Sequence, residues 1–123
     1  MATISSHVLD SIIGDHARGI RVECFRLTGA TTKEKVFDVT ANEEGRIAVP
    51  IVFDPAKSAT AISDLQYELV FHSAAYFKSQ PATPAARQIM DVVVVRIVIP
   101  EPGKRIHIPV VLSPHSYTIW WSA

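Results

Sequence analysis

Apolar and polar residues alternate in several short segments of this chain, and turn-forming residues separate those segments. In the clearest example Ile20, Val22 and Cys24 alternate with Arg21 and Glu23. A spacing of two residues places side chains on one face of a β-strand. Short strands at close spacing with turns between them are typical of a β-sandwich. We therefore predict an all-β fold in which helix is a minor component.

The middle of the chain continues this pattern with one interruption. Residues 65–71 alternate again, and residues 73–79 provide the one plausible short helix, which nearby prolines end. The Pro- and Ala-rich residues 81–86 follow no periodicity, so we expect an exposed and mobile loop there. The β-branched run 89–99 is long enough to predict a central strand that is covered on both faces.

The last third of the chain predicts two more strands. After a turn at 100–103, apolar residues at alternate positions of 105–112 share one face, and His107 lies on the opposite face. A second turn at 113–116 leads into a final strand at 117–121, which is rich in aromatic and β-branched residues.

Composition limits the number of domains and the redox setting. A chain of 123 residues that is 48% hydrophobic fits one compact domain, so we assign residues 1–123 to a single domain. Cys24 is the only cysteine, so no disulfide can form within the chain. A buried thiol in a strand core, in a reducing compartment, is the simplest interpretation.

Charge and hydropathy exclude several classes of partner. Twelve basic and twelve acidic side chains cancel, and no basic cluster predicts binding to nucleic acid or to an anionic membrane. No apolar run approaches the roughly 18 residues that span a bilayer, and the first residues do not read as a secretion signal. The last three residues are not the peroxisomal Ser-Lys-Leu signal, so we expect a soluble cytoplasmic protein.

Several separate motifs occur in an order that is specific to one family. They are Ser6-His7-Val8-Leu9-Asp10, Glu44-Gly45-Arg46, Tyr67-Glu68-Leu69-Val70-Phe71-His72 with Tyr76-Phe77, and His107-Ile108-Pro109-Val110-Val111-Leu112-Ser113-Pro114. Together, from about Ile4 to Tyr117, they resemble the transthyretin-like 5-hydroxyisourate hydrolases.

The resemblance implies a two-sheet transthyretin-like β-sandwich with one short helix. It also implies a homotetramer, a dimer of dimers whose central channel holds active sites built from His7, Arg46 and His107. The hydrolases add a C-terminal Tyr-Arg-Gly-Ser, where this chain has Trp120-Trp121-Ser122-Ala123, and many have a histidine at the position of Arg105. The resemblance implies no cofactor.

The three retained residues suit chemistry at a carbonyl group. Imidazoles titrate near neutral pH and can move protons, and the guanidinium of Arg46 can bind an enolate, a carboxylate or a developing oxyanion. No cluster of His, Cys and Asp has the spacing of metal ligands, and Cys24 has no histidine beside it in sequence. The remaining histidines lie in turn or strand-end contexts and are interpreted as structural: His16, His72 and His115.

Three functions remain open. The favoured one is an enzyme that acts on a small cyclic carbonyl or heterocyclic substrate other than, or besides, 5-hydroxyisourate, by ring hydrolysis or by steering a cyclisation or isomerisation. The others are ordinary 5-hydroxyisourate hydrolysis in purine breakdown, and a non-catalytic carrier of an aromatic small molecule. Trp120, Trp121 and Ser122 are the candidate substrate-binding residues, because indole rings there would favour an aromatic ligand. Alternatively, the two indoles only stabilise a subunit interface.

Overall fold

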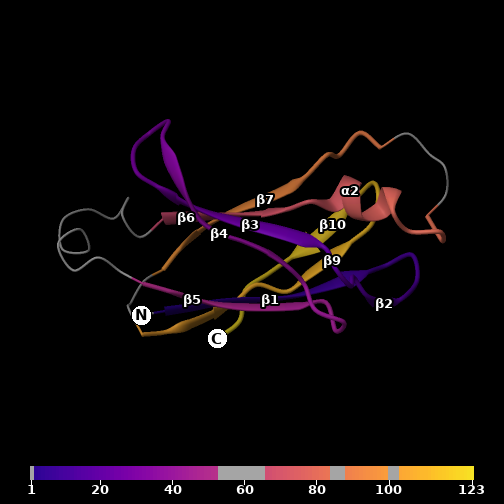
Figure 1. Ribbon diagram of the computed structural model, residues 1–123, viewed down its shortest axis with the longest axis horizontal. Helices are drawn as coiled ribbons and strands as arrows, with labels where there is room; N and C mark the ends of the chain where they lie inside the picture. Colours follow the sequence, from indigo (N-terminus) through magenta and orange to yellow (C-terminus); the bar gives the residue numbers. More distant parts are fainter. Residues whose placement is uncertain (1, 53–65, 84–87, 100–102) are drawn as a thin grey trace.

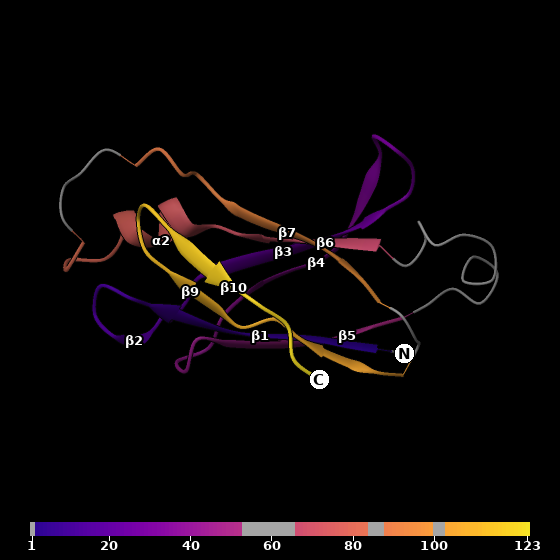
Figure 2. The ribbon, with the colours of Figure 1, turned by 180° about the vertical axis from the view of Figure 1, so that it is seen from behind.

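The computed structural model describes residues 2–52, 66–83, 88–99 and 103–123. Its strands form two sheets that face each other, and one short helix lies at one end of the sandwich (Figures 1 and 2). The predicted two-sheet β-sandwich with a short helix is confirmed. Within the described ranges, no helix has the length and hydropathy needed to cross a bilayer.

The first sheet is built around the N-terminal strand. On one side, β1 (Ala2–Asp10) pairs antiparallel with β5 (Arg46–Ile51) and β2 (Asp15–His16). On its other side it pairs in parallel with β8 (Arg105–His107) and then β9 (Val110–Leu112), and β10 (Tyr117–Ile119) follows β9 antiparallel. β1 therefore brings the two ends of the chain into one sheet.

The second sheet is antiparallel throughout, in the order β4, β3, β6, β7. Its strands are β3 (Arg21–Leu27), β4 (Lys33–Thr40), β6 (Gln66–Phe71) and β7 (Val93–Val98). The helix α2 (Ser73–Lys78) follows β6, within one residue of the predicted 73–79. The Tyr76 hydroxyl of α2 donates a 2.8 Å hydrogen bond to buried Asp10, which ties the helix to β1.

The core lies between the two sheets, where the alternating residues of both meet. Val22, Cys24, Leu69, Phe71 and Val110 have essentially no exposed surface, as the alternation predicts. Burial raises the pKa of the Cys24 thiol to about 12, so this thiol is a core side chain and not a nucleophile.

The β-branched run at 89–99 is not the central strand that we predicted. Among the described residues, the strand β7 is limited to residues 93–98 and pairs only with β6, at the edge of its sheet. Val94 and Val98 are 44% and 48% exposed, so the described part of the chain does not cover one face of β7. A run of valines does not distinguish an edge from a centre, because covered and half-covered strands both favour β-branched residues.

Two predicted strands near the C-terminus are also shorter than expected. The segment 105–112 divides into β8 and β9 around Pro109, which has no N–H to give to a ladder. The final strand ends at Ile119 instead of residue 121, although Ser122 forms an isolated antiparallel bridge with His107. Three predicted features lie wholly or partly outside the described residues: Leu65, positions 84–86 of the loop, and positions 100–102 of the turn.

Candidate active site

The outward face of the first sheet gathers the three residues predicted from sequence. Alternation along β1 sends Ile4 and Val8 into the core, so Ser5 and His7 point away from it. His7 is paired with Arg46 of β5, and Ser5 is paired with His107 of β8. Paired residues on neighbouring strands project to the same face, so His7, Arg46 and His107 share one surface.

A tight turn before β5 places Arg46. The side-chain oxygen of Asn42 accepts hydrogen bonds from the backbone N–H of Glu44 at 2.9 Å and of Arg46 at 3.0 Å. Gly45 has a φ of +68°, and a Cβ at this position would collide with the backbone oxygen of Val8. Only glycine fits both constraints. The Glu-Gly-Arg motif therefore has a direct structural reason for its glycine.

A hydroxyl group and a second arginine hold His107. The Oγ of Ser5 lies 2.8 Å from Nδ1 of His107, and Nε of Arg105 donates to the same Oγ at 3.2 Å. Because Ser5 accepts from Arg105, its one hydroxyl proton is available for Nδ1 of His107. This arrangement satisfies every group when neutral His107 carries its proton on Nε2, so the ring presents an N–H donor to the site.

His7 also has a side-chain partner, and sequence reasoning missed it. Nε2 of His7 lies 3.0 Å from Nδ1 of His16, with the two ring centroids 5.1 Å apart. His16 is paired with Leu9, the next outward-facing position of β1 after His7. Gly14, which has a φ of +64°, was the sequence signal that could have predicted this contact. A glycine turn at this position returns the chain, so that residue 16 lies beside β1.

The electrostatics of the site favour neutral histidines beside a free cation. Burial first, and then the charges of Arg46, His16 and His107, lower the pKa of His7, while a backbone hydrogen bond with Glu44 acts in the opposite direction. Burial and then Arg105 and Arg46 lower the pKa of His107. Both imidazoles are therefore available as uncharged groups near neutral pH. The guanidinium of Arg46 makes no hydrogen bond or ion pair with another described residue, which leaves it available for an anion.

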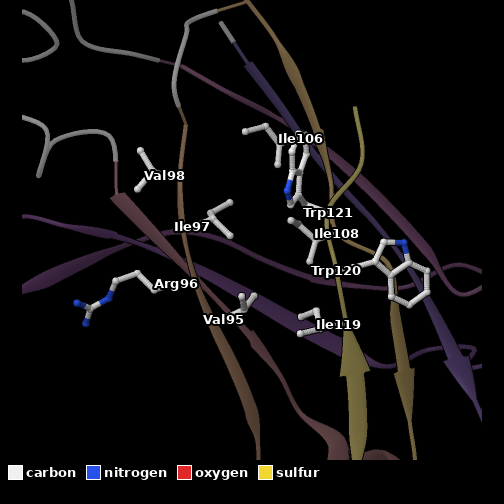
Figure 3. A pocket seen from close by; sticks show the side chains of 9 residues that line it. All are labelled: Val95, Arg96, Ile97, Val98, Ile106, Ile108, Ile119, Trp120 and Trp121. Atoms are coloured by element: carbon white, nitrogen blue, oxygen red, sulfur yellow. The ribbon is translucent and has the colours of Figure 1, made fainter.

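The C-terminal residues do not all lie on the outward face that carries His7, Arg46 and His107. Because Ser122 bridges to His107, it shares the outward face, and Figure 2 shows the C-terminal segment running beside β8. Trp121 belongs to the opposite side of the segment, and in Figure 3 its ring lies near Ile106 and Ile108. Trp120 points away from β7 in the same view.

Both tryptophans line an apolar pocket of about 410 Å³ at the open edge between the two sheets. Its other lining residues come from β7, from β10, and from β8 and the residue that follows it: Val95, Arg96, Ile97, Val98, Ile106, Ile108 and Ile119. The structure thus brings His7, Arg46, His107 and Ser122 to one face, whereas the ring of Trp121 lies at the pocket and Trp120 borders it with its ring turned away from β7. In the described part of the chain, no group of three His, Cys, Asp or Glu side chains is arranged to hold a metal ion.

Several known proteins have a similar sequence or fold. The chain is 33% identical to the 5-hydroxyisourate hydrolase of Deinococcus radiodurans over 95% of this chain and 92% of that protein. Its structure superimposes on (S)-allantoin synthase with a TM-score of 0.74 and 25% identity, covering 99% of this chain but only 44% of the synthase chain. It superimposes on sea bream transthyretin with a TM-score of 0.76 and 19% identity, covering 97% and 93% of the two chains.

The sequence also matches one protein family over almost its whole length. Residues 4–121 fit the HIUase/transthyretin family, which includes both strands that carry the imidazoles and the turn that carries the arginine. This match agrees with the sandwich topology and with the 33% identity to a hydrolase. The chain belongs to the HIUase/transthyretin family.

Proposed function

We propose that this protein is a ring-opening hydrolase of small cyclic amides, with 5-hydroxyisourate as the first substrate to test. The observation that carries this proposal is the convergence of His7, Arg46 and His107 on one outward face, with two neutral imidazoles beside a guanidinium that has no ion-pair partner among the described residues. The name of the Deinococcus radiodurans relative supports the same reaction class.

Each of the three side chains has a distinct task in this proposal. A water molecule adds to the ring carbonyl carbon, and His7 accepts one proton from that water. Arg46 and the Nε2–H of His107 stabilise the negative oxygen that forms. The C–N bond then breaks, and the proton held by His7 goes to the departing nitrogen. Water has thus been added across the amide bond, and no covalent enzyme intermediate is needed.

The proposal includes the homotetramer that the family resemblance implies. In a single chain the histidine and arginine side chains lie on an open sheet face, where water weakens every electrostatic interaction. A channel between dimers would enclose that face and strengthen the contact between Arg46 and an anion. Multi-angle light scattering on the purified protein tests this part directly, and a mass of one chain at assay concentration contradicts it.

The C-terminal residues enter the proposal as determinants of substrate choice. Ser122 lies on the same face as His107 and can contact a substrate there, whereas Trp121 is 72% exposed and faces the apolar pocket. Trp121 and Ala123 stand at the positions of the hydrolases' Arg and terminal Ser, so the cation is absent and the hydroxyl of this segment is that of Ser122. We expect this segment to favour a larger or more aromatic cyclic substrate besides 5-hydroxyisourate.

A carrier function is the second candidate, and the pocket beside the tryptophans is the observation that favours it. A volume of about 410 Å³ with a mainly apolar lining is within the range of small-molecule sites. Titration with an aromatic probe such as 1-anilinonaphthalene-8-sulfonate, followed by tryptophan fluorescence, would detect this site. Tight binding in a protein that has no turnover on any cyclic amide would support the carrier over the enzyme.

The experiment that tests the enzyme is a spectrophotometric assay with freshly generated 5-hydroxyisourate. It compares the wild type, His107→Ala, and a variant whose last four residues are changed to Tyr-Arg-Gly-Ser. The matched control is His115→Ala, which removes an exposed histidine in the turn before β10. A functional imidazole is expected to contribute about 10²–10⁴-fold to the rate, so His107→Ala should lose that much and His115→Ala nothing.

The outcomes separate the hypotheses. Fast turnover by the wild type supports ordinary 5-hydroxyisourate hydrolysis. Turnover by the Tyr-Arg-Gly-Ser variant alone supports an intact site whose substrate has changed, and the search then moves to aromatic cyclic amides. Equal rates for the wild type and His107→Ala contradict the proposed site.

A further inference from the structure

His16 contacts His7 but has no task in the hydrolysis described above. The contact joins Nδ1 of His16 to Nε2 of His7 at 3.0 Å, and the ring planes are inclined by 41°. This geometry is a hydrogen bond between ring edges and not a stacking contact. Because Nε2 of His7 faces His16, we assign Nδ1 to the reacting water, next to the backbone of Glu44 that also hydrogen-bonds the ring.

The charges around the two rings differ in sign. His7 lies beside the permanent cation Arg46 of β5, and His107 of β8 is close enough to lower its pKa further. His16 is adjacent to a carboxylate, because Oδ1 of Asp15 lies 3.8 Å from its Nε2. The guanidinium of Arg18 lies 3.2 Å from Oδ2 of Asp15 and 3.8 Å from Oε2 of Glu43. These two carboxylates largely balance its positive charge.

A positive charge is therefore better placed on His16 than on His7. On His7 it would lie beside a permanent guanidinium, and on His16 it would lie beside Asp15, whose own pKa is lowered by a backbone hydrogen bond from His16 and by Arg18. The distance of 3.0 Å between the two ring nitrogens is short enough for one proton to pass between them. His16 is also partly exposed, with 33% of its side chain accessible, so solvent can stabilise the charge.

We propose that His16 is a positioning residue that stores the proton displaced from His7 during the reaction, an inference that rests on the hydrolase function proposed above. When Nδ1 of His7 accepts a proton from the attacking water, the proton on its Nε2 passes to Nδ1 of His16. His7 stays neutral, and His16 becomes an imidazolium beside Asp15. When the C–N bond breaks, Nδ1 of His7 gives its proton to the departing nitrogen, and His16 returns the stored proton to Nε2 of His7.

This exchange leaves the two rings as they began. The water oxygen is bonded to the carbonyl carbon, one water proton is on the departing nitrogen, and no oxidant or further reactant is required. The inference also explains why His7 can serve as a base beside a permanent cation, since its ring does not need to hold the charge.

The kinetic test compares His16→Ala with His115→Ala, using steady-state turnover of 5-hydroxyisourate. We expect His16→Ala to lose about 10-fold to 100-fold in kcat with little change in KM, which is less than the roughly 10²–10⁴-fold of a direct acid or base. Added imidazole should restore part of the kcat of His16→Ala, because the alanine leaves space for a free ring beside His7. An unchanged kcat, or a loss that imidazole does not restore in a variant with normal thermal unfolding, overturns the proposal.

A titration without substrate keeps this test separate from the proposed function. Nitrogen NMR of protein with labelled histidine side chains reports the protonation and tautomer of each ring. We expect His7 and His16 to titrate as one coupled pair in the wild type, with two steps visible at both rings, and His7 to show a single step in His16→Ala. Independent single-step curves in the wild type overturn the proposal. If the wild type does not hydrolyse 5-hydroxyisourate, the proposed function fails, while this titration still decides whether the pair exchanges a proton.

Discussion

Two outward sheet faces of this molecule carry arginine and histidine side chains, and they differ in how that charge is balanced. On the ion-paired face, formed by β3, β4 and His72, every cation has a carboxylate. Arg21 makes two hydrogen bonds to Asp38, at 2.9 and 2.7 Å. Glu23 accepts from Lys35 at 2.9 Å and contacts His72 at 2.6 Å.

The histidine–arginine face, formed by His7, Arg46, Arg105 and His107 on β1, β5 and β8, has no such balance. Its side-chain hydrogen bonds within the described chain go to a hydroxyl group and to another imidazole, namely Ser5 and His16. Positive charge without a carboxylate partner leaves donors that an anionic ligand can use. The comparison indicates that missing partners, more than the presence of His and Arg, distinguish the candidate active site from a structural charge network.

Replacing one arginine on each face tests this comparison with the largest expected effect. Arg46→Ala should lower kcat/KM for 5-hydroxyisourate by about 10²–10³-fold, because it removes a donor to the developing negative charge. Arg21→Ala should leave kcat/KM unchanged, since Arg21 already has Asp38 as its partner. Similar rates for the two variants in the same spectrophotometric assay would show that the unbalanced charge has no catalytic role.

The next effect concerns the turn that positions Arg46. Gly19 and Gly45 both have positive φ, but only at Gly45 would an added Cβ collide with backbone. Gly19→Ala should therefore cost about 1–2 kcal/mol in the free energy of unfolding, as left-handed backbone does for other residues. Gly45→Ala should cost more, and it should also reduce kcat because Arg46 moves. Urea unfolding and turnover of both variants provide the measurement, and equal costs would argue against the collision.

The two faces should also respond to acid in different pH ranges. The pKa values of His7 and His107 are lowered from 6.5, so the unfolded chain binds their protons first. Folding stability from these residues is thus complete above pH 6.5 and decreases as pH falls through their lowered values. Hydrogen bonding to Arg21 lowers the pKa of Asp38 from 3.8 to about 2, so its contribution persists above pH 3.8 and is lost toward pH 2.

Denaturant unfolding at a series of pH values measures this difference. His107→Gln should flatten the dependence of stability on pH below pH 6.5 and leave the range of Asp38 unchanged, and Asp38→Asn should do the reverse. Likewise, kcat/KM should decrease as the pH falls through the lowered pKa values of His7 and His107, and it should not decrease above them. If one variant changed the stability equally in the pH range of the histidines and in the pH range of Asp38, the assignment of one range to each face would be contradicted.

The smallest effect is expected from the ion-paired face itself. Asp38→Asn should lower the thermal midpoint slightly, and the difference from wild type should shrink as salt is added, because exposed ion pairs are screened. Catalytic rates should not change. Scanning calorimetry at low and high salt measures the effect, and a large midpoint loss that persists in high salt would mean that this network supports the core.

Much of the fold and part of the site could be predicted from sequence, because these features depend on neighbours in the chain. The alternation around Val22 and Leu69 identified strands that are buried on one face, and Gly45 marked the turn that presents Arg46. Family motifs then grouped His7, Arg46 and His107. The structure places these three residues on one face through the pairing of β1 with β5 and β8. Their role in catalysis stays a prediction.

Contacts between distant segments were decided only in the tertiary structure. Ser5 and His107 are 102 residues apart, and no local pattern shows that the hydroxyl holds that imidazole or that Arg105 supports the hydroxyl. The same reason explains the error at β7 and the unforeseen contact between His16 and His7. The sequence determines which side of a strand is apolar, because that depends on a period of two residues. The number of strands that pair with a given strand, and the side chain that an imidazole contacts, depend on how all the strands are arranged.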